Sequence, residues 1–116
     1  MKIRIKDNTV RYRMSKTEVS QLAETGAIWS STVFLDGVFR YGIETTEEET
    51  LSASFQEGSI VLRMPEAMIQ ALVQTDIVGF DGISGPVKLL VEKDFVCLDK
   101  TDEDQTDNYP NPNVMC

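Results

Sequence analysis

The chain has 116 residues, of which 41% are hydrophobic, and its 11 basic and 19 acidic side chains give a net charge of −8. This size and composition suit one domain with a hydrophobic core, which needs no metal or disulfide to fold. No run of about 18 consecutive apolar residues is present to span a membrane, and an acidic chain disfavours nonspecific binding to nucleic acid.

Apolar and basic residues alternate over the first 14 positions, a period-two pattern that is typical of half-buried strands. Asp7-Asn8 supplies a tight turn, so the segment predicts a β-hairpin. The outer face of this hairpin would pair basic residues directly: Arg4 with Arg11, and Lys2 with Arg13.

A helix is predicted over residues 16–25. Ser15 and, three residues later, Glu18 fit a capping box, in which each side chain forms a hydrogen bond with the backbone amide of the other residue. Val19 and Leu22 form one apolar stripe, and Gly26 is placed to end the helix.

A second hairpin is predicted from residues 27–34 and 38–45, around Leu35-Asp36-Gly37. Most of the aromatic area of the chain lies here, and we expect it in the core rather than on a stacking surface: Trp29, Phe34, Phe39 and Tyr41. The acidic run of residues 47–49 then reads as a solvated loop.

The pattern of the first half returns after fifty residues, with strands at 51–55 and 60–64 and a helix that begins at Pro65. The last hairpin is predicted from 77–80 and 87–92, around a loop at 81–86. On this interpretation the offset between the two copies changes from fifty to forty-five residues, because the turn at Asp36-Gly37 would correspond to Asp81-Gly82.

These elements predict an α+β domain of two pseudo-repeated ββαββ halves, at about 1–46 and 51–98. The strands should form a mostly antiparallel sheet or a flattened barrel with two covering helices; the alternative is two separate small sheets packed through their helices. We expect residues 1–98 to be one packed domain, and residues 99–116 to be an acidic, proline-containing tail that lies on its surface.

The basic face of the first hairpin is the candidate functional site: Lys2, Arg4, Arg11 and Arg13. Like charges that face each other on adjacent strands are unfavourable, so something negative should offset them. The interpretation we favour is intramolecular, with acids of 47–49 or 99–107 lying across the face. The alternative is a phosphorylated or nucleic-acid-like anion held between the arginines.

Catalytic and metal motifs are absent. The chain has no histidine, which removes the usual general base and the commonest metal ligand, and it has no glycine-rich phosphate loop. We assign no catalytic residue and no cofactor. Asp99, Asp102 and Asp104 remain candidates for a loose divalent-cation site, although Asp107 replaces the glycine that an EF-hand loop requires.

The two cysteines, Cys97 and Cys116, form no close-spaced motif. With no apolar export signal at its start, the chain is expected in a reducing cytoplasm, which argues against a disulfide between them.

The C-terminal third resembles the signature of a known family. Glu92-Lys93-Asp94-Phe95, Cys97-Leu98, an acidic run and Tyr109-Pro110-Asn111-Pro112 are similar to a family of small bacterial cytoplasmic proteins classed only as a domain of unknown function. The resemblance covers nearly the whole chain and implies a bacterial cytoplasmic origin. It implies no activity and transfers no catalytic residue.

Three functions stay open. The first is a non-enzymatic binding or interaction module that uses Arg4, Arg11, Arg13 and residues 109–112, with a protein or a small anion as partner. The second is an anion- or nucleotide-binding domain that uses the basic hairpin. The third is a carboxylate-based enzyme or divalent-cation protein that uses Asp94, Asp99, Asp102 and Asp104. The lack of histidine and of a glycine-rich loop favours the first.

Overall fold

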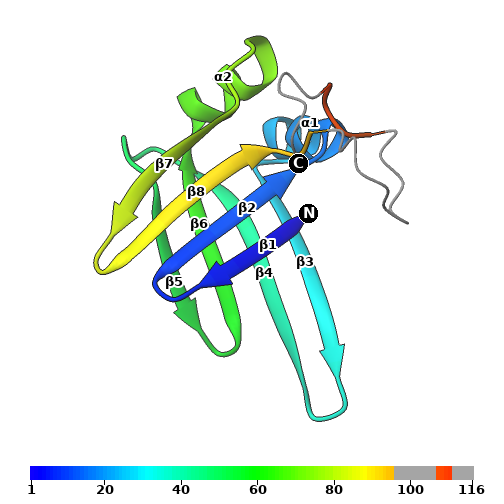
Figure 1. Cartoon of the computed structure of the whole chain (residues 1–116), viewed down its shortest axis with the longest axis vertical. Helices are drawn as coiled ribbons and strands as arrows, with labels where there is room; N and C mark the ends of the chain where they lie inside the picture. The colour runs from blue at the N-terminus through cyan, green and yellow to red at the C-terminus, as the bar shows by residue number, and fades with distance from the viewer. Residues whose placement is uncertain (96–106, 111–116) are drawn as a thin grey trace.

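A computed structural model describes residues 1–95 and 107–110 (Figure 1). Its elements follow the chain as two ββαββ halves. The first half contains β1 (Lys2–Lys6), β2 (Thr9–Met14), α1 (Lys16–Thr25), β3 (Ala27–Phe34) and β4 (Gly37–Thr46). The second half contains β5 (Ser52–Gln56), β6 (Ser59–Pro65), α2 (Glu66–Gln74), β7 (Gly79–Ser84) and β8 (Val87–Lys93). The predicted α+β class with two similar halves is confirmed.

The strands divide into two four-stranded sheets, with the orders β1-β2-β8-β7 and β3-β4-β6-β5. Each sheet takes one hairpin from each half, and the two hairpins meet through a parallel pairing of β2 with β8 or of β4 with β6. The other pairings are antiparallel, as expected. In Figure 1 the sheets overlie one another with crossing strands, and both helices gather at one end. The halves are therefore intertwined, and neither of them forms a sheet of its own.

The predicted start and end of the first helix are confirmed. Ser15 Oγ accepts from the Glu18 amide at 3.4 Å, and the Ser15 amide donates to Glu18 Oε1 at 2.9 Å, which completes the capping box. Gly26 ends the helix with φ of +85°, a conformation that favours glycine. Pro65 stands at the start of α2, also as predicted.

The repeat keeps its offset of fifty residues to the end, so the predicted change of offset is wrong. β3 ends at Phe34 and β7 at Ser84, while β4 begins at Gly37 and β8 at Val87. The dipeptide Asp81-Gly82 lies inside β7 and is no turn. A Cβ at Gly82 would lie 3.2 Å from the Cβ of Leu51, so the glycine leaves room at a tight approach.

Equivalent positions of the two halves build the core. The pairs are Tyr12 and Leu62, Met14 and Met64, Val19 and Ile69, and Leu22 and Leu72, each no more than 1% exposed. They share one cluster with residues of both sheets and both helices. Burial raises the pKa of the Tyr12 phenol, whose hydroxyl points to the Ile60 carbonyl oxygen 3.5 Å away in the other sheet.

Of the four aromatic residues of the second hairpin, Tyr41 packs against the core cluster and the other three do not, which corrects the prediction for Trp29, Phe34 and Phe39. Trp29 is 45% and Phe34 57% exposed, and Phe39 and Tyr41 are only half-buried. Trp29 is exposed because it alternates with Ile28, which packs against the core, and so lies on the outer face of the sheet. For Phe34 the reason is register. Ser59, the first residue of β6, pairs with Arg40, two positions further along β4 than the equivalent pairing of Thr9 with Lys88 would place it. The end of the β3–β4 hairpin therefore extends past β6 and projects from the body, as Figure 1 shows.

Candidate anion-binding face

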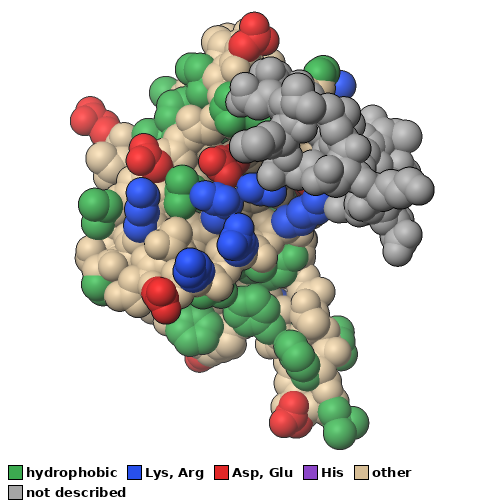
Figure 2. Space-filling model, in the orientation of Figure 1, with side chains coloured by type: hydrophobic (Ala, Val, Ile, Leu, Met, Phe, Trp, Pro, Cys, Tyr) green, Lys and Arg blue, Asp and Glu red, His purple; other side chains and the backbone are tan. Residues whose placement is uncertain are grey.

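The outer face of β1 and β2 carries the predicted basic cluster. Arg4 pairs with Arg11, and Lys2 with Arg13, in the register that the turn at residues 7 and 8 predicts. Alternation along these strands sends the apolar side chains inward and the basic ones outward. Figure 2 shows Lys and Arg side chains gathered on this face.

Strand β8 extends the face, and no local sequence signal indicates this because the β2–β8 pairing joins distant segments. Lys88 lies beside Thr9, and Glu92 beside Arg13. Lys6, at the end of β1, belongs to the same outer face as Arg4. We call the set of Lys2, Arg4, Lys6, Arg11, Arg13 and Lys88 the basic face.

Part of the positive charge is balanced within the chain. Glu92 Oε1 lies 3.2 Å from Arg11 Nε and 3.7 Å from Arg13 Nε, and Asp94 Oδ2 lies 2.8 Å from Lys2 Nζ. Acids of the chain therefore offset part of the charge, but they are Glu92 and Asp94 and not the predicted ones. Residues 47–49 form no ion pair with this face in the described chain, and residues 99–106 lie outside it.

At the centre of the hairpin the charge of Arg4 is unbalanced, and Arg11 is ion-paired but incompletely hydrogen-bonded. Within residues 1–95 and 107–110, Arg4 has no acidic partner in ion-pairing range. Arg11 Nε is buried and forms no hydrogen bond within these residues, because its short distance to Glu92 lacks hydrogen-bonding geometry. A buried donor left without an acceptor is costly, so the Arg11 side chain, which lines the pocket, is incompletely satisfied.

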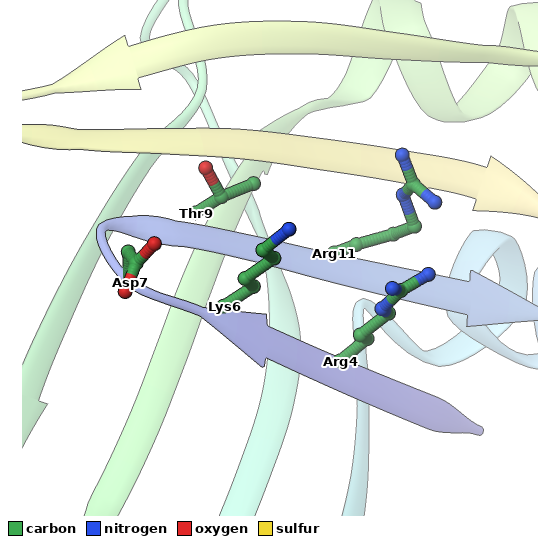
Figure 3. Close-up of a pocket in the computed structure, with 5 residues that line it drawn as sticks. All are labelled: Arg4, Lys6, Asp7, Thr9 and Arg11. Carbon is green, nitrogen blue, oxygen red and sulfur yellow. The ribbon is translucent and has the colours of Figure 1, made fainter.

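An open pocket of about 370 Å³ lies over these residues. Its lining is Arg4, Lys6, Asp7, Thr9 and Arg11. In Figure 3 the side chains of Arg4 and Arg11, from neighbouring strands, extend to the same side of the hairpin. Three cations and one acid therefore surround a space that can admit a small molecule.

The second half carries no equivalent cluster. Ser52, Ser54 and Val61 occupy the positions of Lys2, Arg4 and Arg11. The pocket on the outer face of the other sheet, about 440 Å³, has a single charged residue, Arg40, among its lining side chains. Because the fold is repeated and the charge is not, the basic face is not needed to build a ββαββ half.

The C-terminal segment of residues 107–110 docks beside the start of α1. Thr17 donates to Asp107 Oδ1 from its hydroxyl at 2.9 Å and from its amide at 3.3 Å. Tyr109 pairs with Phe95, its amide donates to the Asp94 carbonyl oxygen at 2.8 Å, and Lys93 Nζ lies 4.9 Å from its ring centre. The segment thereby holds Asp94, which pairs with Lys2 of the basic face.

Asp107 makes this docking depend on pH. Hydrogen bonds from the Ser15 and Thr17 side chains hold the pKa of Asp107 below its usual range. A lowered folded-state pKa contributes stability above the unfolded-state pKa of about 3.9, and this stability is lost as the pH falls through the folded-state value. Asp107→Asn should therefore melt at a lower temperature than the wild type at neutral pH, and the gap should close on acidification. A gap that stays constant down to about pH 3 would contradict this role of the carboxylate.

The other candidate residues are not brought together. No group of three metal-binding side chains occurs in the described residues, and Asp94 is paired with Lys2. Asp99, Asp102, Asp104, Cys97 and Cys116 lie outside the described residues, as do residues 111 and 112 of the tail. None of the helices in the described part of the chain has the length and apolar character needed to cross a membrane.

The fold and the site define a small α+β protein of two sheets, each built from both halves, with one basic outer face. The chain belongs to the family described as "Family of unknown function (DUF7009)", whose model matches residues 1–113. This confirms the resemblance to a family without an assigned activity. No curated protein and no solved structure matches the chain.

Proposed function

We propose that this protein is a non-enzymatic binding module whose basic face holds a small anion with phosphate groups. The observation that carries the proposal is the pair of Arg4, which lacks an acidic partner in the described chain, and Arg11, whose buried Nε lacks an acceptor. Guanidinium groups present several donors in a planar fork that matches phosphate oxygens.

A multivalent small anion fits this face better than a nucleic acid. The two arginines and Lys6 surround one open pocket, whereas the whole chain carries a charge of −8, which opposes a long polyanion. The bacterial and cytoplasmic setting remains part of the proposal, and its support is the family resemblance described above.

Pyrophosphate should stabilise the protein at concentrations above its Kd. A ligand that binds only the folded state adds about 2.7 kcal/mol at one hundred times its Kd, so above the Kd the melting temperature should rise with the logarithm of the pyrophosphate concentration. Sodium chloride at matched ionic strength separates binding from screening. The double variant Arg4→Ser and Arg11→Val, which copies the equivalents Ser54 and Val61 of the second half, should lose the shift.

Arg40→Ser is the matched control, because Arg40 lines the pocket of the other sheet. It should keep the full pyrophosphate response. An equal response in the double variant, or an equal effect of sodium chloride, would rule out a specific site on the basic face.

A further inference from the structure

The four sheet edges differ in how they are protected. β1 carries Lys2, Arg4 and Lys6, and charged side chains oppose pairing with another chain. The β5 and β7 edges are tied together, because Ser84 Oγ accepts from the Ala53 amide at 3.3 Å. β3 has eight residues, Ala27–Phe34, with no charge, proline or glycine. It is the one long, unprotected edge among the strands that the structure describes.

Strand geometry locates the free backbone groups of β3. Phe34 and Gly37 flank a two-residue loop, so they form a hydrogen-bonded pair, and every second residue before Phe34 also bonds to β4. The backbone N–H and C=O groups of Trp29, Ser31 and Val33 therefore point away from β4, toward the free edge of the sheet. The same alternation places the Ala27 amide at the edge, where it donates to Thr25 Oγ1 at 3.4 Å. Only the stretch from Trp29 to Val33 is left for a partner strand.

We propose that β3 pairs in antiparallel fashion with β3 of a second copy, with Ser31 on the twofold axis. In this register Trp29 faces Val33 of the other copy on the outer face, and Phe34 faces Ile28 on the inner face. Aromatic side chains opposite β-branched ones are favourable cross-strand pairs. The exposed groups of Trp29, Ser31 and Val33 become the hydrogen-bonded positions, and the two four-stranded sheets join into one of eight strands.

The neutral edge allows a second copy to approach here, and the strand is self-complementary in this register. The chain has a charge of −8, so most surfaces of two copies repel each other, but β3 is neutral along its length. The nearest charged side chain on the neighbouring strand is Arg40, which pairs with Ser31. Three strand spacings then separate the two Arg40 positions, roughly 14 Å, which exceeds the screening length of about 8 Å at physiological salt.

The side chains that this pairing would cover are exposed in the single chain. Val33 is 78% exposed, and Trp29 and Phe34 are about half exposed. Figure 2 shows hydrophobic side chains along the projecting hairpin. A partner strand would shield both faces of the hairpin from water.

Sedimentation velocity of the full chain tests the dimer, over concentrations on the order of 1–500 µM that bracket micromolar Kd values. The wild type should shift from monomer to dimer across this range. Ser31→Pro removes an amide that points to the free edge, so the fold should survive while the Kd rises about tenfold or more. Val33→Lys, at a highly exposed position, should weaken the dimer similarly.

Phe55→Lys is the matched control, because Phe55 is 67% exposed on the opposite edge strand of the same sheet. It should leave the dimer unchanged, and circular dichroism should show that all variants fold. A wild type that stays monomeric throughout, or a dimer that Ser31→Pro and Val33→Lys leave intact, would overturn the proposal. A monomer that co-sediments with phosphatidylcholine vesicles would also overturn it and assign the hairpin to a lipid surface.

Discussion

Leu22→Ala and Leu72→Ala should each lower the free energy of unfolding by about 2–5 kcal/mol. The two leucines lie fifty positions apart on α1 and α2, they are buried, and they belong to one core cluster. Truncation of either would leave a cavity between the helices and the sheets, since close-packed neighbours relax only in part. Urea unfolding followed by circular dichroism measures the loss.

The number of steps in the urea unfolding curve tests the topology. Each sheet contains hairpins from both halves, so the loss in one half should destabilise the whole chain in a single step. Leu35→Ala is the control, because Leu35 is fully exposed at the hairpin tip and should leave the midpoint unchanged. A two-step transition, in which one half of Leu22→Ala stays folded, would contradict the intertwined topology.

Arg4→Glu should raise the stability of the free protein while it abolishes the response to pyrophosphate. The substitution replaces a like-charge pair with Arg11 by an opposite-charge pair on adjacent strands, which is worth about 0.2–1 kcal/mol. The same carboxylate repels an anion and competes for the guanidinium of Arg11. Thermal melting with and without pyrophosphate reads both effects in one experiment.

These opposite signs separate a binding role from a structural one. If Arg4 served only to stabilise the fold, its replacement would lower the melting temperature. Arg63→Glu on β6 is the control, because Arg63 is the equivalent of Arg13 in the second half and lies on the other sheet. It should keep the pyrophosphate response. A destabilised Arg4→Glu variant that still binds pyrophosphate would contradict the proposed site.

Local signals explain what could be predicted about the fold. The capping box at Ser15 and Glu18 and the turn at Asp7-Asn8 act over three or four residues, so sequence is enough to place α1 and the first hairpin. Gly82 misled the prediction because a glycine after aspartate looks like a turn. Gly82 instead lies beside Leu51, a neighbour thirty-one positions away whose Cβ would be 3.2 Å from a Cβ at this position.

Long-range pairing explains what could not be predicted. The hairpins are exchanged between the halves, and the two-residue difference in register between β4–β6 and β2–β8 leaves Phe34 exposed. Neither feature has a local signal in the sequence. The same limit applies to the site. Alternation predicted that Arg4 faces Arg11, whereas Glu92 and Lys88 reach this face only through the parallel pairing of β8 with β2.

The most direct test of the anion site is a pyrophosphate titration of the ¹⁵N-labelled full chain, followed by amide chemical shifts. We expect saturable chemical-shift changes at the amides of Arg4, Lys6, Thr9 and Arg11, which line the pocket on β1 and β2. Ser31 and Arg40, in the pocket of the other sheet, should stay unchanged. Changes that centre on that second pocket, or that fail to saturate and follow ionic strength, would contradict the claim that the basic face is the binding site.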